Sequence, residues 1–342
     1  MKPFEVVTAA DEADAMGRFQ SAHAGGDSGT GAAAYIAGGT TVVDLLKLNA
    51  LQPNVLIDLG PLRSRLSSIV KTQDGFRIGA MATMTEVAQH PEVARHFPAA
   101  VESLRLAASG QIRNMATLGG NLLQRTRCSY FRDGHAACNK RKPGTGCAAI
   151  GGASRGLAIL GVSQHCIANY PGDLAVALVA LDATIQVLGT DGSRNDMPVA
   201  SLYRLPEDSP HIETHLAPGD LITSVSLPFS SRAETSLYLK IRDRWSYAFA
   251  LASAAVAVEL DEARIVRSIR IVLGGLASVP WRCEASERYL LGKSLDAESA
   301  GAAAELAVAD ARTDDQTRFK PELARRTVIK ALLDAGSRKA GR

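Results

Sequence analysis

The chain has 342 residues, of which 46 % are hydrophobic and 21 % are charged. This composition can form a sizeable buried core, and the length indicates about two domains of ~150 residues each. The 38 basic and 35 acidic side chains leave a formal net charge of only +3, which argues against a nucleic-acid binder with a clustered basic face. The sequence also lacks the roughly 20-residue apolar stretch of a membrane-spanning helix.

The first third of the chain alternates short helical and strand patterns. Thr8 followed by Asp11 predicts a cap ahead of an amphipathic helix. Short apolar runs that end at glycine or turn residues predict strands, and apolar residues at helical spacing predict helices. On these grounds we expect strands at 34–37, 55–59 and 76–79, and helices near 42–49, 86–90 and 98–108.

Residues 109–170 differ from the rest because Gly, Cys and basic residues are frequent and periodicity is weak. An irregular stretch of this length inside a compact domain is usually functional or disordered. Beyond it, a helix is expected at 173–181 and a strand at 183–188. A second domain of α+β type is predicted to begin near Ser230, with strands at 236–241, 249–260 and 264–273 and then helices at 284–291, 296–311 and 320–335.

Two glycine pairs share one local pattern. Gly38 and Gly39 lie in the first glycine loop (residues 37–41), and Gly119 and Gly120 lie in the second glycine loop (residues 117–121). Glycine lets the backbone approach a ligand closely, and exposed N–H groups at such a turn suit an anion. One pair alone more often serves a tight turn, whereas two such loops favour a diphosphate gripped from both sides. Neither loop is a G-x-G-x-x-G fingerprint or a Walker loop, so an ordinary Rossmann protein is not expected.

These loops, together with residues 109–114 (Ser-Gly-Gln-Ile-Arg-Asn), resemble the FAD-binding medium subunit of the molybdenum hydroxylases. That family includes xanthine dehydrogenase, carbon monoxide dehydrogenase and aldehyde oxidoreductases, and the resemblance covers essentially the whole chain. It implies an α+β protein with an FAD-binding domain of the PCMH/vanillyl-alcohol-oxidase type at 1–229, in two subdomains at about 1–60 and 61–229. It further implies a C-terminal α+β domain of the carbon monoxide dehydrogenase flavoprotein type at 230–336 and a loose tail at 337–342.

The resemblance also implies the residues that hold FAD. Asp173 matches the family's acid on the adenosine ribose, although a helix N-cap would explain it equally well. Lys240 matches the family's basic residue near the flavin, although a solvated strand lysine is nearly as good an interpretation. The expected cofactor-binding residues are Ala37, Gly38, Gly39, Thr40, Thr41, Ser109, Thr117, Gly119, Gly120, Asn121, Asp173 and Lys240.

Four of the five cysteines, Cys128, Cys138, Cys147 and Cys166, fall in one segment (residues 122–168), which we call the cysteine segment. No two of them have the close spacing, about two to four residues, of zinc fingers and ribbons. Disulfides would need an oxidising compartment, and the lack of an evident secretory signal argues against them. Four thiolates on a glycine-rich loop suit a [4Fe–4S] cluster. His165 is a rival ligand, although a surface or cap role is the preferred interpretation, and Cys283 is interpreted as a core thiol.

Basic residues accompany the four cysteines. A cluster held by four thiolates is anionic, so nearby cations would stabilise it. The alternative interpretation is a basic surface patch with no cluster. The segment resembles the medium subunit of periplasmic-type aldehyde oxidoreductases, which carries such an insertion. The basic residues are Arg125, Arg127, Arg132, Lys140, Arg141 and Lys142.

The sequence therefore predicts an oxidoreductase subunit that contains FAD and a [4Fe–4S] cluster and transfers electrons to an external acceptor. The family implies a molybdenum-cofactor large subunit, which would hold the substrate site, and a [2Fe–2S] small subunit. Other molybdenum hydroxylases, of the xanthine dehydrogenase or hydroxybenzoyl-CoA reductase type, are alternatives, as are a stand-alone FAD reductase and a zinc-binding scaffold. No secretory signal is evident, so we expect a cytoplasmic location or export to the periplasm with a partner.

Overall fold

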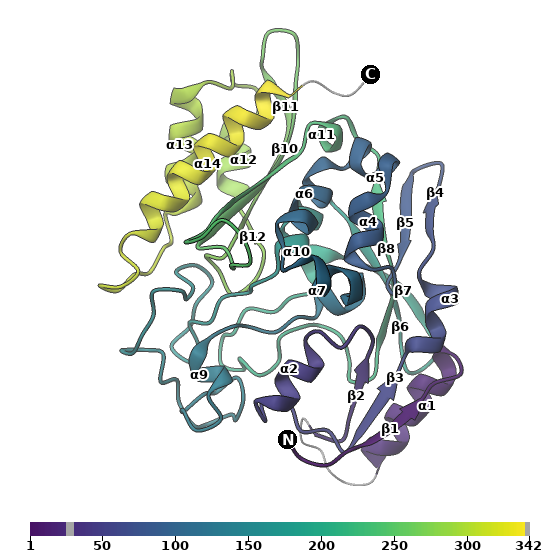
Figure 1. Cartoon of the computed structure of the whole chain (residues 1–342). Coiled ribbons are helices and arrows are strands. Elements are labelled where there is room, and N and C mark those ends of the chain that lie inside the picture. The colour runs from purple at the N-terminus through teal and green to yellow at the C-terminus, as the bar shows by residue number, and fades with distance from the viewer. Residues whose placement is uncertain (25–30, 339–342) are drawn as a thin grey trace.

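The computed structural model describes residues 1–24 and 31–338, which form three β-sheets with helices packed around them (Figure 1). The first sheet is parallel, with strand order β1-β3-β2. The chain crosses from β1 to β2 and then returns to β3, so right-handed crossovers place the two connecting helices on opposite faces. These elements are β1 (Glu5–Thr8), α1 (Glu12–Ala24), β2 (Ala33–Ile36), α2 (Val42–Lys47) and β3 (Val55–Asp58).

The start of α1 differs from the prediction. Thr8 is the last residue of β1, a strand that the sequence did not predict, and it pairs with Asp58 of β3. The cap is supplied by Asp11, whose carboxylate accepts the N–H of Asp14 at 2.8 Å. Thr8 extends the parallel ladder instead, because sheet pairing with a distant strand decides its conformation.

The second sheet has five antiparallel strands in the order β4-β5-β8-β6-β7. Its helices bury one continuous apolar core, which includes Phe97, Leu104 and every residue of α10 after Asp173. The predicted strands at 76–79 and 183–188 are present, whereas β4, β7 and β8 were not predicted. The strands are β4 (Ile69–Lys71), β5 (Gly75–Gly79), β6 (Thr184–Leu188), β7 (Arg194–Pro198) and β8 (Leu221–Pro228). The helices are η1 (Gly60–Leu62), α3 (Arg63–Leu66), α4 (Met84–Gln89), α5 (Pro91–His96), α6 (Pro98–Leu106), α7 (Gly110–Met115), α8 (Leu118–Leu122), α10 (Asp173–Ala180) and η2 (Val199–Ser201).

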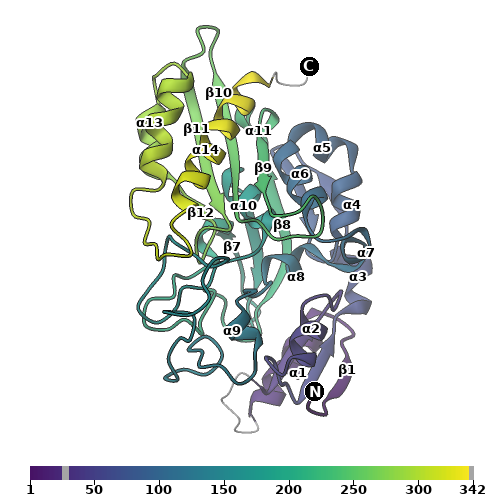
Figure 2. The same cartoon turned by 60° about the vertical axis from the view of Figure 1, so that its left-hand side comes forward.

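The third sheet, of order β12-β11-β10-β9, forms the C-terminal part of the chain. Three helices cover one face, and α10 lies against the other, between this sheet and the five-stranded sheet (Figures 1 and 2). The three strands and three helices predicted here are all present. The elements are α11 (Ser231–Glu234), β9 (Leu237–Ile241), β10 (Ala252–Leu260), β11 (Val266–Gly274), β12 (Trp281–Arg282), α12 (Glu284–Leu290), α13 (Ala297–Ala307) and α14 (Lys320–Ser337).

The first two residues of the predicted loose tail at 337–342 are ordered. Ser337 is the last residue of α14, and Arg338 is anchored by hydrogen bonds to Ser236 and Glu102. Residues 339–342 lie outside the described part of the chain.

The cysteine segment is irregular, as predicted, with one short helix, α9 (Ser129–Arg132), and an isolated bridge between Cys138 and Cys147. It occupies the lower left of Figure 1, beside α2. A second isolated bridge, from Leu160 to Ala277, ties it to the C-terminal sheet. The cysteine segment therefore contacts both the N-terminal part of the chain, through α2, and the C-terminal part, through Ala277.

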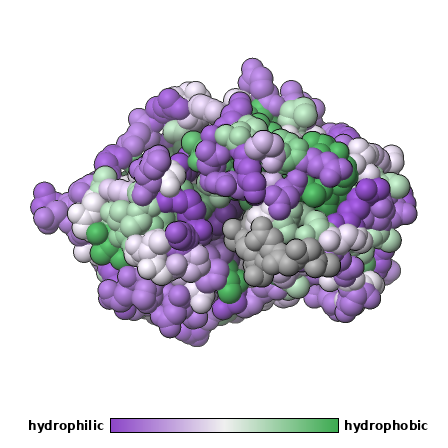
Figure 3. Space-filling view, turned by 90° about the horizontal axis from the view of Figure 1, so that it is seen from below, coloured by the Kyte–Doolittle hydropathy of each residue, from purple (hydrophilic) through white to green (hydrophobic). Residues whose placement is uncertain are grey.

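Seen from below, the surface around the first sheet and the cysteine segment is mostly hydrophilic, with small separate hydrophobic patches (Figure 3). Among residues 1–24 and 31–338, no helix combines the length and the apolar character needed to cross a membrane.

Candidate functional site

A groove of ≈ 160 Å³ lies between the first sheet and the five-stranded sheet. The first glycine loop (residues 37–41) lines it, and so do Thr117, Gly119 and Gly120 of the second. The structure thus brings together two loops that are about 80 residues apart in the sequence. The other lining residues are Tyr35, Val42, Leu59, Ala80, Met81, Leu123, Asp220, Leu221 and Ile222.

In the first loop the two glycines serve different purposes. Gly39 has φ +72°, in the left-handed region that glycine adopts at no steric cost. Gly38 packs against the end of α7, where an added Cβ would lie 1.8 Å from the carbonyl oxygen of Met115. Within the described residues, the backbone N–H groups of Gly39, Thr40 and Thr41 have no protein acceptor. Three unpaired donors at one turn suit an anionic ligand.

The second loop differs from the expectation of a matching set of N–H donors. The N–H of Gly119 donates to Ala80 O at 2.9 Å, and the N–H of Gly120 donates to Thr117 Oγ1 at 3.3 Å. A Cβ on Gly119 would lie 3.1 Å from Ala80 Cβ. The first loop therefore offers the N–H donors, and the second offers a closely packed surface without side chains.

Asn121 and Ser109, two further predicted cofactor residues, flank the groove without lining it. Asn121 Nδ2 donates to the Met84 sulfur at 3.4 Å, and its Oδ1 is buried with no partner among the described residues. A buried acceptor of this kind normally has a donor, so Asn121 fits a ligand that brings one. Ser109 caps α7 by accepting the N–H of Ile112.

Asp173 and Lys240 lie away from the groove and are paired with each other. Lys240 Nζ is 2.7 Å from Asp173 Oδ2, and the Tyr238 hydroxyl donates to Asp173 Oδ1 at 2.5 Å. Asp173 is the first residue of α10, and its carboxylate does not act as the N-cap. The structure therefore brings these two predicted residues together, at the contact between α10 and β9, and not into the groove.

Two polar groove residues, Tyr35 and Asp220, were missed by sequence reasoning, as were the apolar lining residues other than Ala37. Tyr35 lines the groove and donates its hydroxyl to Gly219 O at 2.8 Å, and Asp220 lines it from the adjoining turn. Burial raises the pKa of Tyr35 well above its ordinary value, so the phenol stays protonated. The Pro218-Gly219-Asp220 sequence is a turn signal, but nothing local indicates that this turn meets β2.

The groove fits a flavin dinucleotide. The N–H groups of Gly39, Thr40 and Thr41 would hold its diphosphate, and the side-chain-free surface at Gly119 and Gly120 would allow close approach. Apolar residues of the lining would contact the ring systems, and Asn121 Oδ1 would accept a hydrogen bond.

The four clustered cysteines share one apolar cluster with Leu45 and Phe131. All carry free thiols; three are buried and Cys147 is half-buried. Across residues 1–24 and 31–338, no three His, Cys, Asp or Glu side chains form a metal-binding group, so the thiols are neighbours that do not converge on one point. Cys283 is buried in the C-terminal core, as predicted.

Burial and nearby donors act in opposite directions on the pKa of two of the thiols. Burial raises the pKa of Cys166 to about 11, while the charge of Lys140 and the N–H of Ala168, 3.5 Å from the sulfur, oppose the rise. Burial likewise raises the pKa of Cys128, against N–H groups of Phe131 and Tyr130. Backbone N–H donors to sulfur are a feature of thiolate ligands in iron–sulfur sites. His165 is half-exposed and pairs with Asp208, so its surface role is the better interpretation.

Most of the basic residues in the segment have partners other than the thiols. Arg127 and Arg132 pair with Asp44, and Arg125 and Lys140 pair with Glu213. Arg141 instead donates to the backbone carbonyls of Tyr130, Phe131 and Ala136. The expected excess of positive charge is therefore only partly balanced, because four cations share the carboxylates of Asp44 and Glu213.

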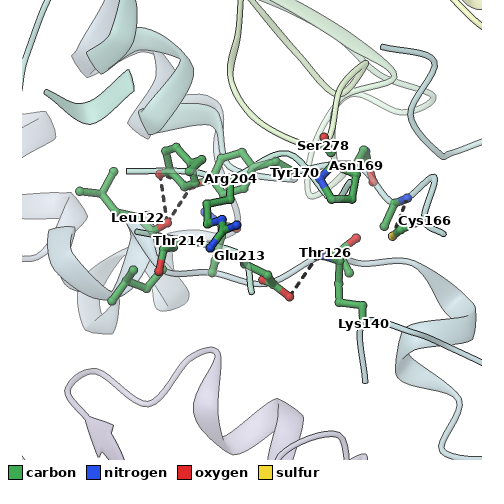
Figure 4. Close-up of a pocket in the computed structure, with 15 residues that line it drawn as sticks. Leu122, Thr126, Lys140, Cys166, Asn169, Tyr170, Arg204, Glu213, Thr214 and Ser278 are labelled. Atoms are coloured by element: carbon green, nitrogen blue, oxygen red, sulfur yellow. Dashed lines mark hydrogen bonds and ion pairs between the residues drawn. The ribbon is translucent and has the colours of Figure 1, made fainter. Parts of the chain in front are cut away.

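A small cavity of ≈ 40 Å³ separates the second glycine loop from the cysteine segment (Figure 4). Lys140 and Cys166 line one end, and Leu122 lies at the other, where its carbonyl accepts hydroxyl hydrogen bonds from Tyr170 and Tyr203, both at 3.1 Å. The cavity has room for only a few waters.

Comparison with known families identifies the class of protein. Residues 2–230 match the FAD binding domain in molybdopterin dehydrogenase, and residues 237–339 match the CO dehydrogenase flavoprotein C-terminal domain. The chain therefore belongs to the FAD-binding subunits of the molybdenum hydroxylases, and it is an oxidoreductase subunit. The predicted family and fold are both confirmed.

Among individual proteins, the chain is 43 % identical over 304 residues to the aldehyde oxidoreductase FAD-binding subunit PaoB of Escherichia coli, covering 89 % of this chain and 91 % of that one. It is 25 % identical to the carbon monoxide dehydrogenase medium chain of Hydrogenophaga pseudoflava, over 90 % of each. The Cu,Mo-CO dehydrogenase in its cyanide-inactivated form has the same fold, with a TM-score of 0.75 over 99 % of this chain and 100 % of that one at 22 % identity.

Proposed function

We propose that this chain is the FAD-containing electron-transfer subunit of a molybdenum-dependent aldehyde oxidoreductase. The observation that carries the proposal is the 43 % identity to an aldehyde oxidoreductase FAD-binding subunit along nearly the whole of both chains. The groove between the two glycine loops supports it, because the N–H donors of Gly39, Thr40 and Thr41 have no acceptor among residues 1–24 and 31–338 and lie where a diphosphate would bind. When bound, FAD passes electrons between two-electron and one-electron partners.

The cysteine segment supports a second cofactor, a [4Fe–4S] cluster ligated by Cys128, Cys138, Cys147 and Cys166. These thiols share one apolar cluster, and the backbone N–H of Ala168 lies 3.5 Å from the Cys166 sulfur. Ligation requires thiolates, so cluster assembly would displace the protons that burial retains on Cys128 and Cys166.

The rest of the proposal concerns partners and location. A molybdenum-cofactor large subunit would oxidise the aldehyde, a [2Fe–2S] small subunit would carry the electrons to this chain, and an external acceptor would take them. The complex works in the cytoplasm, or in the periplasm after export of this chain with a partner.

A tagged copy of this chain, purified alone and from cells that also produce its partners, tests the proposal. The chain alone should show flavin absorption with an additional broad shoulder, one FAD, and about four iron atoms. The complex should add molybdenum and further iron. Flavin without iron would refute the cluster, zinc in place of iron would do the same, and absence of flavin would refute the whole assignment.

A further inference from the structure

Asp220 is the one charged side chain among the described residues that line the groove between the two glycine loops. It lies in the turn before β8, and Leu221 and Ile222, the first residues of that strand, line the groove beside it. None of these lining residues carries a positive charge that could neutralise the carboxylate or a bound diphosphate. A groove that suits an anion at the first glycine loop therefore holds a fixed negative charge in its wall.

The protein satisfies only part of this carboxylate. Asp220 Oδ2 accepts the N–H of Ala217 at 2.8 Å, which closes the turn. Within residues 1–24 and 31–338, Oδ1 accepts no hydrogen bond, and no basic side chain forms an ion pair with Asp220. The side chain is half-buried. A charged acceptor in such a position needs a donor, which comes from water or from a ligand in the groove.

Tyr35 holds the turn against β2 and does not supply that donor. Its hydroxyl donates to Gly219 O at 2.8 Å, so its one polar hydrogen is already used. Burial and the negative charge of Asp220 both raise the pKa of Tyr35, so the phenol remains the donor to Gly219. On its other side the turn packs against α1, where a Cβ on Gly219 would lie 2.8 Å from Phe19 Cδ1. The carboxylate therefore has a fixed place in the groove wall.

We infer that Asp220 binds the adenosine ribose of FAD and so decides which half of the dinucleotide occupies this part of the groove. The inference rests on the proposed function, because it concerns the same FAD site. The vicinal diol of a ribose offers two O–H donors and no charge, which suits a carboxylate with a free oxygen. Hydrogen bonds to an ionised carboxylate are roughly twice as strong as those between neutral groups.

The other parts of FAD suit Asp220 less well. The diphosphate is anionic, and reduction adds negative charge to the isoalloxazine ring, so a carboxylate beside either group would repel it. The ribityl chain is bonded directly to that ring, whereas the adenosine ribose stays neutral and apart from it. Asp173 is already paired with Lys240 away from the groove, so its charge is neutralised. Asp220 is therefore the carboxylate that is available to the diol.

The test compares ADP, 2′-deoxy-ADP and 3′-deoxy-ADP as competitors of FAD on the full-length chain. The flavin is first removed, a limiting amount is added back, and its release is followed by the recovery of flavin fluorescence. For the parent we expect loss of one ribose hydroxyl to weaken binding about tenfold or more, as for a hydrogen bond to a charged group. In Asp220→Asn the same loss should cost about threefold, because a neutral amide oxygen accepts a weaker bond.

The ratio between the affinities for ADP and for a deoxy nucleotide is the informative quantity. Removal of the Asp220 charge also relieves its repulsion of the diphosphate, which changes the affinity for all three nucleotides alike and cancels in the ratio. A carboxylate that served only to close the turn would leave the ratio at the parent's value, because Asn keeps an oxygen for the N–H of Ala217.

Asp191→Asn is the matched control. Asp191 closes the neighbouring turn between β6 and β7 in the same manner, since its Oδ1 accepts the N–H of Ser193 at 2.9 Å, but it does not line the groove. This variant should keep the parent's ratio. The three affinities of the parent provide a measurement that does not depend on any variant folding.

The outcomes separate this inference from the proposed function. A parent that binds FAD but binds ADP and both deoxy nucleotides equally well would overturn the ribose contact. An Asp220→Asn protein that keeps the parent's ratio would overturn it too, and so would ADP that fails to compete with FAD. A chain that binds no FAD at all would instead overturn the proposed function.

Discussion

Lys240 Nζ lies 2.7 Å from Asp173 Oδ2, and the two side chains are only 1 % and 6 % exposed. Asp173 begins α10, and Lys240 is on β9, so this ion pair joins the FAD-binding part of the chain to the C-terminal sheet. Tyr238 donates to the second carboxylate oxygen, and Leu106 O accepts from the ammonium at 3.2 Å. Both charges therefore have hydrogen-bond partners, which is what makes a buried pair tolerable.

Replacing Lys240 with Met should destabilise the protein strongly, because it leaves the Asp173 carboxylate buried without its cation. Breaking a buried pair in this way costs about 3–5 kcal/mol of unfolding free energy. Chemical denaturation of the purified chain measures it. The control is Lys330→Met, which removes an exposed helix pair with Asp334 and should cost at most about 0.5 kcal/mol. A Lys240→Met protein of unchanged stability that no longer binds FAD would instead support the role in the flavin site that the family resemblance implies.

Gly38→Ala should separate the first glycine loop from α7, because the new Cβ would lie 1.8 Å from Met115 O, a backbone atom that cannot move alone. We expect a lower melting temperature and loss of most bound FAD. Gly301→Ala, on α13 with nothing within 4 Å of the added Cβ, should stabilise the protein by about 0.5–1 kcal/mol and keep its FAD. Full FAD retention in Gly38→Ala would show that the loop adapts without loss.

Each change of Cys128, Cys138, Cys147 or Cys166 to Ser should lower the iron content, because a serine oxygen is a poor substitute for thiolate in an iron–sulfur site. FAD should remain bound, because no cysteine lines the groove. Cys283→Ser should keep its iron, because Cys283 is buried in the C-terminal core. Iron analysis of the five variants is the measurement, and equal iron in all five would contradict the ligand assignment.

Lys320 predicts a specific dependence of stability on pH. Its side chain is 0 % exposed, its ammonium donates to the carbonyls of Leu157 and Gly275, and burial, with the charge of Arg155, lowers its pKa from 10.5 to about 8. Between these two values the unfolded chain binds more protons than the folded one, so the unfolding free energy rises with pH. This increase in the unfolding free energy is at most about 3 kcal/mol.

The measurement is the unfolding free energy of the parent minus that of Lys320→Met, at intervals from pH 7 to pH 10.5. This difference should be flat below pH 8 and then increase in favour of the parent, since all other groups titrate alike in both proteins. A difference that stays constant over the whole range would show that the two carbonyls hold the Lys320 proton as firmly as water does.

Local sequence patterns predicted the elements that their own residues stabilise. The strand and helix series of the C-terminal domain is present in the predicted order, because long apolar periodicities there match buried faces. Two of the missed strands, β1 and β7, are short and mostly exposed, so they carry no apolar alternation; their strand character comes from pairing with β3 and β6. The missed strand β8 is eight residues long and mostly buried, and it pairs with β5 and β6. Pairing between segments that are far apart in the chain is not encoded in the local hydrophobic pattern of either segment, so that pattern does not predict it.

The candidate site likewise combines residues that local sequence patterns identify with residues that only tertiary packing brings to the groove. The glycine pairs could be identified from sequence because these backbone positions favour glycine over any other residue. Gly39 has φ +72°, and Gly38 lies so close to the carbonyl of Met115 that a side chain would not fit. Tyr35 and Asp220 could not, because they are ordinary residues whose role arises only from the packing of the turn at Gly219 against β2.

By itself the sequence determined the family, the fold class, the two glycine loops and the concentration of four cysteines in one segment, since each depends on residue type and local spacing. The tertiary structure alone decided which charges meet. It paired Asp173 with Lys240, placed Asp44 between Arg127 and Arg132, and left the N–H groups of one glycine loop unpaired while it used those of the other. Hydrogen bonds and ion pairs depend on distances of about 3 Å between atoms that are far apart along the chain, and only the packing of the whole fold sets those distances.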